Sequence, residues 1–278
     1  MRKQIDSIFV SLFFITCWIF FFYFYPYHLY YKEQITLCVL QPDFLQTYLQ
    51  KPAFLTEICG DYLTQFFLWT GGGSSILTLT FMLTWLGFRI ALLKTGISSH
   101  TSLWALLPIV AEWALSCHLE YPLSMSLGLM CSVWAFLLSI LSTSTRTRGI
   151  LHVIMLTILY CAVGAHFFAY VILVIVYECK HFNNYKLSFF LLLISLLIPI
   201  GGSYFYFLAP RQSYFYPLIS GYMLRQPFVF LLTEGFLLLS LLPALIFRQC
   251  KQWIVLFAVL ALGKNTRLFI RSLLRTLE

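Results

Sequence analysis

The residues best suited to chemistry are acids in the longest polar stretch of the chain, positions 31–75. Four of the ten acidic residues fall there, and Glu57 and Asp61 are four positions apart, so in a helix they would share one face. Carboxylates held at a membrane surface can serve as general base or metal ligand toward a lipid-linked substrate. Asp43, Glu57 and Asp61 are therefore the candidate catalytic residues. The alternative is that these acids only keep an external loop soluble.

Three more ionisable residues lie within apolar runs: Glu112, Glu234 and His166, the last in the stretch AVGAHFF. An ionised side chain at the centre of a bilayer costs at least ~2.5 kcal/mol, so such residues are functional candidates. Glu112 is expected near the outer end of its run. Glu234 is expected about six residues, or roughly 9 Å, from the inner end of its own run. The two acids are therefore not expected to form a carboxylate pair, and hydrogen-bonded contacts between helices are the alternative to a function.

The cysteine and glycine patterns give few further signals. Cys38 and Cys59 share the polar stretch and would form a disulfide in an oxidising compartment, or else stay unpaired. There is no CxxC pair and no Cys/His cluster with zinc spacing, so the sequence predicts no metal and no cofactor. The run Gly71–Gly73 lacks the Lys-Ser/Thr ending of a phosphate loop. It predicts a kink, close helix packing or a discontinuous, substrate-binding helix.

The elements that must position these residues are apolar helices. Hydrophobic residues make up 60% of the 278-residue chain, charged residues 10%, and the mean hydropathy is +0.85. A soluble domain is closer to a quarter charged. Several apolar runs approach the ~20 residues that cross a bilayer. We therefore predict an all-α, polytopic transmembrane helix bundle of seven to eight spans. The spans are expected at about 8–27, 62–88, 103–117, 123–141, 150–177, 187–208 and 228–247, with a short eighth run at 253–262.

The scattered basic residues predict the orientation, because Lys and Arg collect on the cytoplasmic side. A cytoplasmic N-terminus and an outer loop at about 31–61 place 12 of the 18 basic residues inside. The inside set is Arg2, Lys3, Arg89, Lys94, Arg146, Arg148, Arg211, Arg225, Lys264, Arg267, Arg271 and Arg275. The outside set is Lys32, Lys51, Lys180, Lys186, Arg248 and Lys251. Residues 1–247 would form the bundle, and 248–278 a short apolar segment and basic tail, which also fits a truncated version of a longer protein.

The stretch QPDFLQTYLQKPAFLTEICGDYLTQFF resembles an uncharacterised family of bacterial multi-pass inner-membrane proteins. The resemblance rests on Lys51, Pro52, Glu57 and Asp61 and on the run 63–67, and it implies a bacterial cytoplasmic membrane but no function. In layout the chain is loosely similar to the multi-pass glycosyltransferases that use lipid-linked sugars. Those enzymes place a catalytic carboxylate in the first outer loop. This chain has fewer spans and a loop of only about thirty residues.

Three functions fit these observations. A non-catalytic envelope assembly or interaction protein, with other membrane proteins as partners, makes the fewest demands and leads. The first alternative is a membrane enzyme that acts on a lipid-linked substrate through Asp43, Glu57 or Asp61. The second is a transporter that uses Glu112, Glu234 and the glycine break. The lipid bilayer is the expected surroundings in each case. Nucleic acid is not an expected partner, because the basic residues do not cluster on one face.

Overall fold

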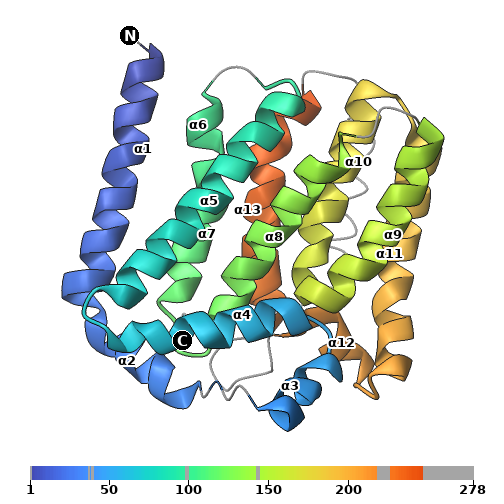
Figure 1. Cartoon of the computed structure of the whole chain (residues 1–278). Helices are drawn as coiled ribbons and strands as arrows, with labels where there is room; N and C mark the ends of the chain where they lie inside the picture. The colour runs from blue at the N-terminus through green and yellow to red at the C-terminus, as the bar shows by residue number, and fades with distance from the viewer. Residues whose placement is uncertain are drawn as a thin grey trace, which may run out of the picture.

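The computed structural model describes residues 2–36, 38, 41–97, 100–141, 145–217 and 226–246, and every regular element in these ranges is a helix (Figure 1). The predicted all-helical class is confirmed. Four helical segments are long and apolar enough to cross a membrane: Asp6–Phe24, Gly72–Lys94, Thr147–His181 and Tyr185–Phe205. The count of seven to eight spans stays a prediction. The short run 253–262 and the tail 248–278 lie outside the described residues.

The bundle consists of apolar helices that run up and down past one another (Figure 1). They are α1 (Arg2–Ile19) with its π-helical continuation η1 (Phe20–Phe24), α5 (Gly72–Lys94), α6 (Thr101–Trp104), α7 (Leu106–Ser116), α8 (Leu123–Ser139), α9 (Thr145–Val163), α10 (Phe167–His181), α11 (Tyr185–Phe205) and α13 (Gln226–Ile246). Phe88, Phe136 and Phe167 are fully buried in the largest hydrophobic cluster, which joins α5, α8 and α10. The helices therefore bury aromatic and aliphatic side chains against one another along the middle of the bundle.

One end of the bundle is covered by short helices, and we call it the capped end (Figure 1). They are α2 (Pro26–Ile35), α3 (Pro42–Leu49), α4 (Phe54–Thr64), the 3-10 helix η2 (Gln65–Leu68) and α12 (Pro210–Phe215). Three of them begin at proline, which suits the first helical position because its missing N–H is not needed there. The expected outer loop at 31–61 is thus largely helical. We call the opposite end, where α1 begins, the N-terminal end.

The glycine run marks the start of a helix. The predicted span 62–88 is broken, because α4 ends at Thr64 and α5 begins only at Gly72. Gly71 caps α5 with a φ of 80°, a left-handed conformation that favours glycine. A Cβ atom on Gly72 would lie 2.2 Å from the Phe66 carbonyl oxygen. The glycines therefore allow the chain to turn sharply into α5, and the expected close packing of the backbone is present.

The segment 150–177, which was predicted to be one span, is a helical hairpin. The hairpin reverses the expected direction of every later helix. α9 and α10 are joined by the 3-10 turn η3 (Gly164–His166), where Gly164 has a φ of 74°. Arg148 and Glu178 are 30 positions apart and form an ion pair, whereas a straight helix would separate them by roughly 45 Å. Hydropathy could not reveal this turn, because the residues on both sides of it are apolar.

Gly164→Ala is expected to lower the stability of the protein by about 1–3 kcal/mol. The new Cβ would lie 2.4 Å from the Tyr216 carbonyl oxygen and 2.8 Å from the Ala53 Cβ, and the positive φ disfavours alanine. Thermal unfolding in detergent measures the loss. Gly201→Ala is the matched control, because no atom lies within 4 Å of its Cβ position. Equal melting temperatures for the two variants would show that a Cβ atom at position 164 is tolerated in the hairpin turn.

Candidate functional site at the capped end

A cavity of about 150 Å³ lies at the capped end, between α2, α4, the start of α5 and the turn that joins α7 to α8. Three charged residues, one basic and two acidic, take part in its wall. The lining residues are Lys32, Ile35, Thr36, Asp61, Thr64, Phe67, Leu77, Ser116, Leu119, Glu120, Tyr121, Pro122 and Leu123. The cavity thus combines an apolar inner wall with a few polar groups, which is the usual composition of a ligand site.

Lys32 is the most unusual residue of this wall. It projects from α2, is 7% exposed, and its Nζ donates to the carbonyl oxygens of Ser116 (2.9 Å) and Tyr121 (3.0 Å). Within the described part of the chain it forms no ion pair. Burial lowers the pKa of Lys32 from 10.5 to about 7. The ammonium therefore uses two of its three hydrogens on the main chain and gains or loses its charge near neutral pH.

Glu57 and Asp61 both lie in α4, where residues four positions apart share one face of the helix. Both side chains are only partly exposed. The Tyr48 hydroxyl donates to Asp61 Oδ2 at 2.7 Å, and the Tyr216 hydroxyl donates to Glu57. Burial raises the pKa of Glu57 to about 7 and raises that of Asp61, although these tyrosines and the nearby Lys51 charge oppose the shift. Of the two acids, only Asp61 lines the cavity.

The other residues predicted for this stretch are placed apart from the cavity. Asp43 is exposed in the first turn of α3, and no described contact joins it to Glu57 or Asp61. Cys38 and Cys59 are free thiols in this structure, and a disulfide between them in an oxidising compartment stays a prediction. Cys59 is exposed on α4, whereas Cys38 lies near the Asp61 side chain.

The three ionisable residues predicted within apolar runs come together in the bundle, which corrects the expectation that Glu112 and Glu234 lie near opposite ends of it, although no described hydrogen bond joins the two carboxyl groups. Glu112 on α7 accepts hydrogen bonds from the Tyr121 hydroxyl (2.9 Å) and the Ser126 hydroxyl (2.6 Å). His166 Nδ1 lies 3.3 Å from Glu234 Oε1 on α13. The charges of Glu112 and Glu234 are close enough to interact. Because the hairpin reverses the direction of α13, the start of this helix and Glu234 lie at the same end of the bundle as Glu112.

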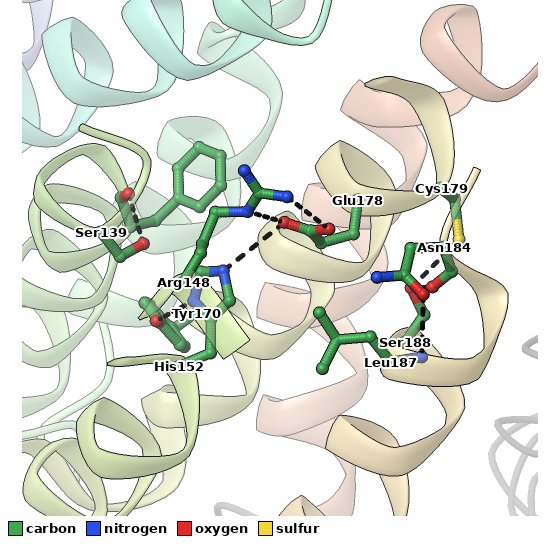
Figure 2. A network of polar contacts seen from close by, with 10 residues as sticks. Ser139, Arg148, His152, Tyr170, Glu178, Cys179, Asn184, Leu187 and Ser188 are labelled. Atoms are coloured by element: carbon green, nitrogen blue, oxygen red, sulfur yellow. Dashed lines mark hydrogen bonds and ion pairs between the residues drawn. The ribbon is translucent and has the colours of Figure 1, made fainter. Parts of the chain in front are cut away.

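A second polar network lies at the N-terminal end of the hairpin (Figure 2). Arg148 Nε donates to Glu178 Oε1 at 2.5 Å, and Arg148 Nη2 donates to Oε2 at 3.2 Å. His152 Nε2 lies 3.7 Å from Glu178 Oε1, and its Nδ1 is 2.7 Å from the Tyr170 hydroxyl. Arg148 and Glu178 are at most 1% exposed. These contacts hold α9 and α10 together away from the cavity, so we assign this network to stability.

Sequence reasoning missed Lys32, Tyr48, Tyr121 and Tyr216. Lys32 was counted only as an external charge, and the chain contains many interfacial tyrosines, so no local signal set these residues apart. Their partners are distant in sequence: Lys32 contacts residues 84 and 89 positions away. In the described ranges, no three His, Cys, Asp or Glu side chains group in a way that could hold a metal ion.

Comparison with known proteins gives one match. A model of a family of unknown function (DUF6057) matches residues 2–271. Neither the curated proteins nor the solved structures contain a significant match to the chain. The matched residues include those of the cavity and the buried acids, so both features lie within the region that the family model describes.

Proposed function

This chain belongs to that family of unknown function, and we propose that it is a multi-pass membrane protein that binds the phosphate-bearing headgroup of a lipid-linked substrate in the capped-end cavity. The membership agrees with the resemblance to an uncharacterised family in the first 90 residues. The bacterial origin and the inner-membrane location of that family stay predictions for this chain. The fold contributes several apolar helices that suit a membrane protein.

The charges at the two ends of the bundle support a capped end that faces outward. Among the described residues, basic positions at the N-terminal end are Arg2, Lys3, Arg89, Lys94, Arg146, Arg148, Lys180 and Lys186. Those at the capped end are Lys32, Lys51 and Arg211, beside the acids Glu33, Asp43, Glu57, Asp61 and Glu120. Because of the hairpin, Lys180 and Lys186 lie at the N-terminal end of the bundle and Arg211 lies at the capped end. This separation favours a cytoplasmic N-terminus more strongly than the sequence tally did.

The single observation that carries the proposal is the buried ammonium of Lys32 in the wall of the cavity. A buried cation without an anionic partner is costly, and a bound phosphate would supply that partner through the third ammonium hydrogen. Asp61 lines the same cavity and can accept hydrogen bonds from sugar hydroxyls. The position of the cavity at an end of the bundle lets the lipid chain remain in the bilayer while the headgroup enters.

A catalytic role for Asp61 is the natural extension of this binding function. Burial raises the pKa of Asp61, which is the direction that favours a role as general acid or base. Glu57 is held by Tyr216 outside the cavity wall, and Asp43 is remote, so Asp61 is the one predicted acid in position to touch a ligand. The interaction role and the transporter role stay predictions, since no described contact favours either one.

Lys32→Met is expected to weaken binding of a polyprenyl-phosphate-linked monosaccharide about 10- to 150-fold, because a hydrogen bond to a charged group contributes about 1.5–3 kcal/mol. The phosphodiester of this probe keeps one negative charge between about pH 6 and pH 8, whereas Lys32, with a pKa of about 7, loses its charge. Affinity of the unchanged chain should therefore fall as the pH rises through 7. Glu57, with a pKa of about 7, becomes negatively charged over the same pH range, and this charge also weakens binding of the anionic probe. Ligand-induced shifts of the melting temperature measure the affinity.

Lys186→Met is the matched control, because Lys186 is exposed at the N-terminal end. It should bind the probe as the unchanged chain does. The melting temperature of each variant without probe separates lost binding from misfolding. Equal affinity of the Lys32→Met variant, or equal affinity for the neutral polyprenol, would overturn the proposal.

A further inference from the structure

A cluster of ionisable side chains lies inside the bundle, behind the cavity. Its members come from α7, the turn before α8, α8 itself, η3 and α13, and they are Glu112, Tyr121, Ser126, His166 and Glu234. The two carboxyl groups and the imidazole are each at most 4% exposed. Two carboxylates cannot both remain charged so close together in an apolar interior without a compensating cation or proton.

The hydrogen bonds divide the cluster into two unequal parts. Glu112 accepts from two hydroxyl groups, so both of its carboxylate oxygens have hydrogen-bond donors. Among the described residues, Glu234 has only the 3.3 Å contact with His166 Nδ1, and neither Glu234 Oε2 nor His166 Nε2 has a hydrogen-bond partner there. Buried polar atoms without partners are rare and call for an explanation. The His166–Glu234 pair is thus the part of the cluster that can accept another proton.

Tyr121 connects this cluster with the cavity. Its hydroxyl donates to Glu112, while its carbonyl oxygen accepts from Lys32, and the residue takes part in the cavity wall. Besides the cavity residues Lys32, Asp61 and Glu120, the titratable groups on this side include His28 on α2, which contacts the main chain of Ser116, the nearby His118, and Cys117 at the end of α7. Tyr121 is therefore the residue that contacts both the cavity lysine and the buried Glu112.

We propose that the cluster is a proton-binding site that exchanges one proton with water in the cavity. In the unloaded state Glu112 and Glu234 are ionised and His166 is protonated on both nitrogens, so the cluster carries a charge of −1. In the loaded state His166 is protonated on both nitrogens and Glu234 carries a proton, so the cluster is neutral. Loading breaks one O–H bond of a hydronium ion in the cavity, leaves a water molecule there and forms the O–H bond of the Glu234 carboxyl group. This inference does not depend on the lipid-linked substrate.

The test uses dicyclohexylcarbodiimide, an apolar reagent that modifies protonated carboxyl groups in apolar surroundings. The full chain in lipid nanodiscs is treated between pH 5 and pH 9, and the modified peptides are identified by mass spectrometry. Labelling of Glu234 should fall about tenfold for each pH unit above the pKa of the pair. Glu234→Gln should remove this label. Tyr121→Phe should increase labelling of Glu112, because it keeps the ring and removes one donor to the carboxylate.

Asp43→Asn is the matched control, because this exposed carboxyl lies outside the bundle and should not affect the pattern. Absence of label on Glu234 while the chain remains folded would overturn the proposal, as would labelling that is independent of pH. Protection by sodium ions at constant pH would assign the site to a metal cation instead. The probe-binding assay with the Lys32→Met variant gives a separate result, so failure of one proposal does not decide the other.

Discussion

Glu178→Ala is expected to destabilise the protein by about 3–5 kcal/mol, the usual cost of removing one partner of a buried ion pair. Arg148 would remain charged in the interior, with its guanidinium carbon 3.7 Å from the centre of the Phe182 ring and without a carboxylate. His152 would lose its contact with the same carboxylate. Denaturation in mixed detergent micelles, followed by circular dichroism, measures the loss.

A double variant tests whether the cost arises from the unpaired charge. Arg148→Met combined with Glu178→Leu replaces the pair by apolar side chains, and such replacements are often neutral or stabilising. The double variant should therefore be more stable than Glu178→Ala alone. If Glu178→Ala instead behaved like Lys186→Met, an exposed substitution near the same end, the ion pair would not hold the hairpin together.

Asp61→Asn is expected to lower turnover of the polyprenyl-phosphate-linked monosaccharide by about 10²- to 10⁴-fold, the usual contribution of a general acid or base. The amide keeps the shape of the side chain and can still accept a hydrogen bond from Tyr48, which lies 2.7 Å away. Binding of the probe and the melting temperature should therefore change little. Release of the sugar, followed by thin-layer chromatography, gives the turnover rate.

Two other acids of the same stretch serve as controls for Asp61. Asp43→Asn should leave turnover unchanged, because Asp43 is exposed on α3. Glu57→Gln should have a smaller effect than Asp61→Asn, since Glu57 does not line the cavity. Full activity of Asp61→Asn would contradict the catalytic role. An unchanged chain that binds the probe without consuming it would leave binding as the function.

Much of the fold follows from local sequence. The expected span at 123–141 corresponds to α8, 187–208 to α11 and 228–247 to α13, with differences of a few residues at the ends. Apolar side chains over such lengths favour a helix that satisfies its own backbone groups. Glu57 and Asp61 were placed in an outer loop, with a shared face expected only if the stretch were helical; α4 contains both of them.

The turn at Gly164 and the assembly of the sites could not be predicted in this way. Hydropathy gives the same signal for one long helix and for two apolar helices joined by a tight turn. Only the packing of Gly164 against Tyr216 and Ala53 shows which of the two is present. The direction of every later helix depends on that turn.

The sequence by itself determined the helical class, the apolar helices and the identity of the ionisable residues that they contain. The tertiary structure decided which of these residues meet. Lys32 reaches carbonyl groups more than 80 positions away, and His166 meets Glu234 across 68 positions. Such contacts depend on how whole helices pack, whereas composition and spacing describe only neighbours along the chain. The cavity and the buried acids are therefore products of packing.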